Sequence, residues 1–275
     1  MTDTVLDKQD EADQRDPYLV PALRHGLEIL RLLSSEQTPL GAPDIVRRLS
    51  LPRASAFRLL HTLESMNFLV ADGDRKFRLG PAVLGLGFGY LASDDLIEVA
   101  QPILRKLRDT TGLSSHMAIL DGSEVVYVVR HAARSTISSS VRVGTRFPVH
   151  ATVMGRMLVC DFTHAQLRAI YPEDRLPCFT PQTPATIGEL AFLLRDDKAR
   201  GYAVSQSFFE TGVSTVAAPV RDSSGQVVAS INVTSVDTHV SEMQLHGVLK
   251  DAVLDAAREI GMWLSPGIDT QISSP

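Results

Sequence analysis

The stretch LPRASAFRLLHTLESM, residues 51–66, decides how the N-terminal part of this chain folds. Its apolar residues recur at intervals of three and four, and they are Ala56, Leu59, Leu60, Leu63 and Met66. That spacing is typical of a helix with one buried face. Pro52 suits the first turn of such a helix, where its missing N–H removes no hydrogen bond. The stretch therefore predicts a packed helix that begins near residue 52.

The other face of the predicted helix carries cationic, hydroxyl-bearing and apolar side chains, which are Arg53, Ser55, Phe57 and Arg58. Arginine can bond guanine with two hydrogen bonds, serine can reach base edges or phosphates, and apolar groups can touch thymine methyl groups. These residues are therefore candidates for contact with a DNA major groove. The alternative is an ordinary solvated face, as on most amphipathic helices.

Two further helices are expected before this one. Residues 20–33 place leucines at positions 23, 27, 30 and 33 in a helical stripe. Residues 42–49 predict a short helix with Arg47 and Arg48 on its outer side, and a tight turn at residues 50–52 follows. Helix, short helix, tight turn and helix is the order of a helix-turn-helix unit.

A basic β-hairpin is predicted directly after the helix-turn-helix. Two short alternating runs, residues 68–70 and 76–79, flank a polar turn with an Asp-Gly pair, which is a hairpin signal. A hairpin in this position is typical of a wing. Arg75 and Lys76, together with Arg47, would then contact the DNA backbone and position the protein. An ordinary hairpin with a solvated edge is the alternative.

The charge distribution favours one local contact with nucleic acid. The 275-residue chain has a formal net charge of −5 and a pI of about 5.9, which argues against a protein that coats nucleic acid or membranes with its whole surface. Residues 1–17 carry six acids and two bases, a net −4, and are expected to be disordered. Residues 41–80 carry seven bases and four acids, a net +3. Such a patch is expected where one module meets phosphates.

The rest of the chain predicts a linker helix and a second domain. Residues 81–92 are interpreted as an apolar helix that packs against a partner subunit, with a buried helix of the same chain as the alternative. Strands are expected at residues 115–120, 124–131, 138–143, 202–204, 213–220 and 227–236. Helices are expected at residues 96–110, 152–161, 166–170, 187–200 and 240–264. This order predicts an α+β domain with an antiparallel sheet.

No motif for catalysis or metal binding stands out in the sequence. A Gly-x-Ser-x-Gly elbow is absent, and the eight histidines and two cysteines lack the spacing of metal ligands. No catalytic residue, metal or cofactor is therefore predicted. Neither a leader segment nor an apolar run of membrane-spanning length is found, so a cytoplasmic protein without membrane contact is expected.

The combination of these features resembles the IclR-type family of transcriptional regulators. The N-terminal block resembles the winged helix-turn-helix of that family, and VGTRFPVHATVMGR, residues 143–156, resembles the hallmark of its effector domain. GYAV at residues 201–204, GV at residues 212–213 and VAAPV at residues 216–220 resemble further parts of that domain. The likeness covers residues 19–265 in the right order.

The resemblance implies a domain order and a function. The implied parts are an acidic tail (1–18), a winged helix-turn-helix (19–80), a linker helix (81–93), a GAF-like effector-binding domain (94–265) and a C-terminal tail (266–275). A dimer or tetramer would bind a pseudo-palindromic operator in double-stranded DNA and respond to a small organic acid. The Met-Gly-Arg variant at residues 154–156 is similar to the subgroup that controls aromatic-acid catabolism, which favours an aromatic acid.

The resemblance also implies an effector site. The backbone N–H groups of Val153 and Met154 would point at a carboxylate, since free amides at a helix N-terminus bind anions. The polar side chains implied around the pocket are Ser205, Thr215, Asn232 and Thr234. The last two face one side of a strand, for which the polar outer face of an edge strand is the alternative. Phe208 could wall an aromatic pocket or belong to the core or an interface.

Three questions stay open at this point. His150 could face the pocket, although a packed and hydrogen-bonded histidine is favoured. The chain could be a DNA-binding protein that senses no small molecule. The C-terminal domain could also be an enzyme, although no acid, base and nucleophile stand together in the sequence.

Overall fold

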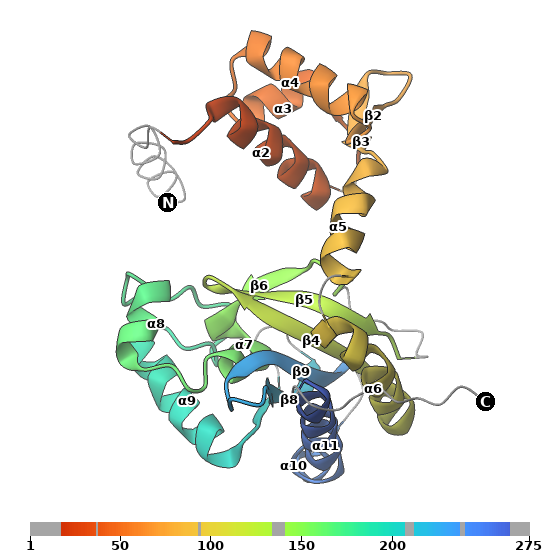
Figure 1. Cartoon of the computed structure of the whole chain (residues 1–275). Helices are drawn as coiled ribbons and strands as arrows, with labels where there is room; N and C mark the ends of the chain where they lie inside the picture. Colours follow the sequence, from red (N-terminus) through yellow and green to blue (C-terminus); the bar gives the residue numbers. More distant parts are fainter. Residues whose placement is uncertain are drawn as a thin grey trace, which may run out of the picture. The chain divides into compact units, whose positions relative to one another are not determined.

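A computed structural model describes residues 18–36, 38–92, 95–133, 141–206, 212–236 and 240–264. The chain divides into two compact units, Met1–Tyr90 and Leu91–Pro275 (Figure 1). The division falls within one helix, α5 (Ala82–Ala92).

The first unit is a small helical domain with a short sheet. Its remaining described elements are α2 (Pro21–Ser35), β1 (Leu40–Gly41), α3 (Ala42–Arg48), α4 (Arg53–Ser65), β2 (Leu69–Ala71) and β3 (Lys76–Leu79). The sheet has the order β1-β3-β2 and is antiparallel, so the hairpin β2–β3 is closed by the strand before α3. The core residues are Ile29, Leu33, Leu40, Ile45, Leu51, Ala56, Leu60 and Leu69. This is the predicted helix-turn-helix with its hairpin.

The buried faces of α2 and α4 differ from the predicted ones. Helix α2 buries a different face, and the buried face of α4 is shorter. Helix α2 turns Gly26 and Ile29 inward, whereas Leu23 and Leu27 are 63% and 53% exposed. A Cβ at Gly26 would lie 3.9 Å from Leu59 Cδ2, so Gly26 rather than Leu23 or Leu27 faces α4, whereas Leu33 stays in the core. Helix α4 ends at Ser65, which leaves Met66 as an exposed cap rather than a core residue.

The second unit is built on a six-stranded sheet. Its described elements are α6 (Asp95–Thr111), β4 (Ser114–Asp121), β5 (Glu124–His131), β6 (Arg146–Pro148), the 3₁₀ turn η1 (Val149–Ala151), α7 (Val153–Leu158), α8 (His164–Ile170), α9 (Ile187–Arg200), β7 (Ala203–Gln206), β8 (Val213–Arg221), β9 (Val227–Val236), α10 (Glu242–His246) and α11 (Val248–Trp263). The strand order is β6-β5-β4-β9-β8-β7, with every pair antiparallel. This is the predicted α+β arrangement.

Helices cover both faces of this sheet (Figure 1). Helices α6 and α11 pack on one face over a core that includes Ile231 and Val233. Helix α7 lies on the other face against β7, β8, β9 and β4, with α9 packed behind it. Because side chains alternate along β9, Asn232 and Thr234 face α7, and the polar residues of the strand meet that helix.

Side-chain caps start several helices of the second unit. The Thr152 hydroxyl accepts the Gly155 N–H at 3.0 Å and so fixes the start of α7. Thr163 and Ser241 form capping boxes with the glutamine three residues later, at the starts of α8 and α10. Such caps satisfy backbone donors that have no partner within the helix.

Two predicted elements of the second unit are wrong. The strand expected at residues 138–143 does not include residues 141–143, which lead into a turn, and residues 138–140 lie outside the described residues. The strand that pairs with β5 is Arg146–Pro148 instead, because the Thr145 N–H bonds back to Arg142 O and closes the turn first.

The helix expected at residues 240–264 is broken into α10 and α11 at Gly247. A Cβ at Gly247 would lie 2.6 Å from Met243 O, so only glycine allows this approach.

Candidate functional sites

The outward face of α4 presents exposed cationic side chains. Arg53 and Arg58 are exposed and form no ion pair within the described part of the chain. Phe57 is 71% exposed, which is unusual for a large aromatic residue, and Ser55 is half-buried. All four candidate residues of the predicted helix therefore lie away from its buried face, which Ala56 and Leu60 occupy.

The tip of the β2–β3 hairpin adds two more exposed cations, Arg75 and Lys76. One carboxylate oxygen of Asp72 accepts the backbone N–H of Asp74 at 3.1 Å and that of Lys76 at 2.9 Å. Arg75 takes a positive φ of 55° in this turn. The turn therefore has a defined backbone, and both cationic side chains project from it into solvent.

Unlike the exposed cations named above, Arg47 has an ion-pair partner. Its guanidinium lies 2.6 Å from an Asp44 carboxylate oxygen, one turn earlier in α3, and both side chains are largely exposed. Exposed pairs of this kind contribute between zero and about 1 kcal/mol. A phosphate could therefore replace Asp44 at small cost, and Arg47 keeps its place among the candidate DNA contacts.

A hydrogen-bonded cluster of polar side chains lies on the sheet face that α7 covers. Asn232 is 3% exposed, and its amide nitrogen lies 3.1 Å from Thr215 Oγ1 and 3.0 Å from Thr234 Oγ1. The Thr234 hydroxyl in turn donates to Thr215 Oγ1 at 3.2 Å. Three of the four predicted polar effector residues therefore touch one another. Because β9 is a central strand, the alternative of an edge strand with a polar outer face is wrong.

The three remaining described candidates lie on β7 and α7, which pack next to the strands of this cluster. Ser205 is buried on β7 and pairs across the ladder with Thr215. Helix α7 begins at Val153 and Met154, whose amides form no hydrogen bond within the part of the chain that the structure describes. Phe208 lies outside the described residues.

His116 belongs to the same cluster, although its sequence context hardly indicates it. Its Nδ1 lies 2.9 Å from Asn232 Oδ1, and its ring packs edge-on to Tyr127 with the centroids 5.6 Å apart. Burial lowers the pKa of His116 to about 4, so the imidazole is neutral at pH 7. The one local signal is a polar run, Ser114-Ser115-His116, that opens an otherwise apolar strand.

A buried ion pair anchors α7 behind the cluster. Arg156 Nε donates to Asp197 Oδ2 on α9 at 2.7 Å, and both side chains are at most 3% exposed. A second nitrogen of Arg156 donates to Val204 O on β7 at 3.3 Å. A Cβ at Gly155 would lie 2.1 Å from Val149 O, so α7 also sits directly on the preceding 3₁₀ turn. The start of α7 is therefore held rigidly over the sheet.

His150, which also lies in the hallmark segment, has a structural role. Its Nε2 lies 2.8 Å from Pro177 O and its Nδ1 lies 3.2 Å from the Tyr171 hydroxyl. Both ring nitrogens are therefore engaged, and the side chain is 1% exposed. The structure thus has the packed, hydrogen-bonded histidine that the sequence favoured.

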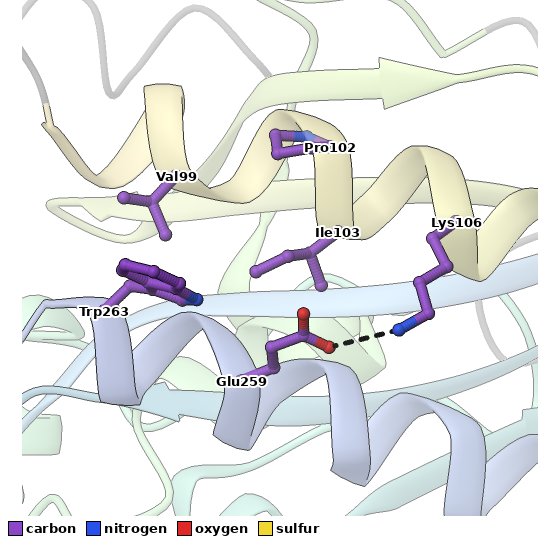
Figure 2. Close-up of a pocket in the computed structure, with 6 residues that line it drawn as sticks. All are labelled: Val99, Pro102, Ile103, Lys106, Glu259 and Trp263. Atoms are coloured by element: carbon purple, nitrogen blue, oxygen red, sulfur yellow. Dashed lines mark ion pairs between the residues drawn. The ribbon is translucent and has the colours of Figure 1, made fainter. Parts of the chain in front are cut away.

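A cleft of about 340 Å³ lies on the opposite side of the sheet, between α6 and α11 (Figure 2). Its lining residues are Val99, Pro102, Ile103, Lys106, Glu259 and Trp263. The Lys106 ammonium lies 3.7 Å from a Glu259 carboxylate oxygen at one end of the cleft. None of the predicted effector residues lines this cleft.

The fold and the two sites define a class of protein, the DNA-binding regulators that join a helix-turn-helix to an effector domain. The family model described as the IclR helix-turn-helix domain matches residues 22–73, and that described as the bacterial transcriptional regulator IclR C-terminal domain matches residues 88–262. The chain belongs to the IclR family of transcriptional regulators, which confirms the predicted family and fold class and excludes the enzyme alternative.

Relatives resemble the chain over nearly its full length. The Pca regulon regulatory protein of Pseudomonas putida is 32% identical over 254 residues, which is 92% of this chain and 87% of the relative. An IclR transcriptional regulator from Alicyclobacillus acidocaldarius is 25% identical, with a TM-score of 0.79 over 90% of this chain and 100% of that one. An IclR homolog from Microbacterium hydrocarbonoxydans, solved in complex with 4-hydroxybenzoate, is 25% identical, with a TM-score of 0.75 over 88% of this chain and 98% of that one.

Among the described residues, no helix has both the length and the apolar character that a membrane span needs.

Proposed function

We propose that this regulator binds a pseudo-palindromic operator as a dimer or tetramer and changes its affinity for that operator when it binds a small aromatic carboxylic acid. The observation that carries the proposal is the hydrogen-bonded cluster of Thr215, Asn232 and Thr234 on the sheet face that α7 covers. Burying polar groups costs free energy unless hydrogen bonds offset it, so a polar cluster on this covered face indicates a functional role. A polar cluster covered by a helix whose first two amides form no hydrogen bond among the described residues suits a small anion with polar substituents.

The proposed roles in the effector site follow the chemistry of each group. The amides of Val153 and Met154 bind the carboxylate, and Ser205 with the threonine and asparagine side chains contacts the rest of the ligand. Phe208 keeps its sequence-based role as an apolar wall. The name of the Pca regulon relative and the 4-hydroxybenzoate bound to the Microbacterium homolog support an aromatic ligand.

The proposed DNA contacts divide into two kinds. Arg53, Ser55, Phe57 and Arg58 on α4 meet base edges or nearby phosphates in the major groove. Arg47, Arg75 and Lys76 contact the backbone, where they set position rather than sequence. Six of these seven side chains are exposed and Ser55 is half-buried, which supports the assignment. The five-part domain division given above and a cytoplasmic location belong to the same proposal.

Exposed apolar residues of the first unit support self-association. Helix α2 exposes Leu23 and Leu27, and α5 exposes Leu84, Leu86 and Tyr90, each by more than half. Groups of exposed apolar side chains mark interaction sites. We propose that α5 and α2 contact a second copy of the chain, and a twofold dimer of this kind requires a pseudo-palindromic operator.

The proposal is tested by thermal unfolding of the purified protein with a panel of aromatic and aliphatic acids, followed by calorimetric titration of each hit. A ligand at 100 times its Kd should stabilise the protein by about 2.7 kcal/mol. Asn232→Ala should abolish the response. Ser230→Ala is the matched control, since Ser230 is buried on the same strand but donates to Ala218 O. If no acid stabilises the protein, the sensing proposal fails and only operator binding remains.

Operator binding is measured in the same preparation by fluorescence anisotropy. The acid that stabilises the protein should change the affinity for the operator by roughly 5- to 150-fold, which is the usual size of allosteric coupling. An acid that binds with no effect on operator affinity would contradict the regulatory part of the proposal.

A further inference from the structure

Both threonine hydroxyls of the polar cluster already donate a hydrogen bond. The Thr215 hydroxyl donates to Val233 O at 3.0 Å. The Thr234 hydroxyl donates to Thr215 Oγ1 at 3.2 Å. Each hydroxyl has a single proton, so neither threonine can donate to the Asn232 side chain. Both threonine oxygens can only accept from it.

This proton count fixes the orientation of Asn232 and the tautomer of His116. The amide group that faces the threonines must be the donor, Nδ2, which supplies its two hydrogens to Thr215 and Thr234. Oδ1 therefore faces His116 Nδ1 at 2.9 Å. Because Oδ1 only accepts, the proton of the neutral imidazole lies on Nδ1. The second ring nitrogen, Nε2, is then an unprotonated acceptor.

His116 Nε2 has no hydrogen-bond partner among the described residues, although the side chain is 1% exposed. Burial also lowers the pKa of this histidine, so protonation does not turn Nε2 into a donor at neutral pH. An unpaired buried acceptor is costly, which is unusual in a cluster whose other members are satisfied. A carboxylate cannot satisfy it, because two acceptors would then face each other.

We infer that the ligand of this site carries a hydrogen-bond donor separate from its carboxylate, a hydroxyl or an N–H group, which donates to His116 Nε2. The inference rests on the proposed function, in which the α7 side of the sheet binds an organic acid. It narrows the ligand class from carboxylic acids in general to hydroxy- or amino-substituted ones. His116 is thus assigned as a specificity-determining residue.

The first test compares hydroxy acids, aromatic and aliphatic, each with its own O-methyl ether, by calorimetric titration of the full-length protein. The ether keeps the carboxylate and the oxygen but lacks the proton. At least one hydroxy acid should bind about 10-fold or more tightly than its ether, as expected where a buried acceptor would otherwise stay unpaired.

Two variants separate hydrogen bonding from the added bulk of the methyl group. His116→Asn keeps a donor for Asn232 but removes the acceptor at Nε2, so the preference for the hydroxy acid should fall to about 2-fold or less. His116→Gln places an amide oxygen near the position of Nε2, so it should retain part of the preference. A preference that persists unchanged in His116→Asn would overturn the role of His116.

The tautomer is measured independently by NMR of protein with ¹⁵N-labelled histidine, with His116→Asn used to assign the signal. The ligand-free protein should show His116 protonated at Nδ1 and unprotonated at Nε2 at pH 7. The opposite tautomer would overturn the inference without reference to any ligand. If acids bind but each hydroxy acid matches its ether, the inference fails and the proposed function stands. If no acid binds, both fail.

Discussion

Acidification should destabilise the second unit through His116, and the size of the effect follows from its pKa. The folded-state pKa is about 4, below the ordinary value of 6.5. Between these values the unfolded chain therefore binds more protons than the folded chain, and stability falls as the pH falls. From pH 7 to pH 4.5 the loss due to His116 should be about 2–3 kcal/mol, with a steepest slope of about 1 kcal/mol per pH unit.

Urea unfolding at several pH values measures this loss. Trp263 is the single tryptophan of the chain and lies in α11, so its fluorescence reports on the second unit. Burial also lowers the pKa of His131 and His150, which act in the same direction. The contribution of His116 is therefore the difference in pH dependence between the natural protein and His116→Asn.

The control for this experiment is His61→Asn, because His61 is an exposed residue of the other unit. It should leave the transition reported by Trp263 unchanged at every pH. If His116→Asn shows the same loss of stability between pH 7 and pH 4.5 as the natural protein, the reasoning from burial is refuted.

Three further predictions concern the ion pair, the wing and the proposed dimer. Asp197→Asn leaves the Arg156 guanidinium buried without its anion and should lower the unfolding free energy of the second unit by about 3–5 kcal/mol; a change below 1 kcal/mol in urea unfolding would contradict this. Lys76→Ala should weaken operator binding on all sequences alike and reduce the slope of log K against log salt by about 0.9, whereas an unchanged slope would exclude a phosphate contact. Leu86→Asp alters a side chain that is 66% exposed, so sedimentation should show smaller assemblies without loss of helical content; unchanged assembly would exclude α5 from the interface.

Elements with strong local signals could be predicted from the sequence. The helix Ile187–Arg200 and the strand Val227–Val236 have the expected bounds, because caps and alternation define them locally. The break at Gly247 could not be predicted, since it depends on a close approach to Met243 O. The exposed face of α2 could not be predicted either. Leucines at intervals of three and four suggest a buried stripe, but the face that is buried depends on the packing partner, which the sequence does not show.

The effector site, too, could be predicted only in part from the sequence. Two side chains on β9 were predicted to share a face, and that follows from strand geometry alone. The place of His116 in the site could not be predicted, because its partner Asn232 is 116 residues away. Neither segment by itself indicates that β4 pairs with β9. A lone histidine in an apolar strand is usually a core residue. Only the pairing of β4 with β9 turns it into part of a hydrogen-bonded cluster.

The separation of the two sites restricts how a ligand could control DNA binding. Every described effector candidate lies within Leu91–Pro275, and every DNA-binding candidate lies within Met1–Tyr90. A ligand changes operator affinity only if it binds one arrangement of the DNA-binding units more tightly than another. Within one chain the covalent connection between the sites is α5. A variant of an exposed α5 residue, such as Leu86→Asp, should therefore reduce the effect of the ligand on operator affinity while the affinity for the ligand itself changes little.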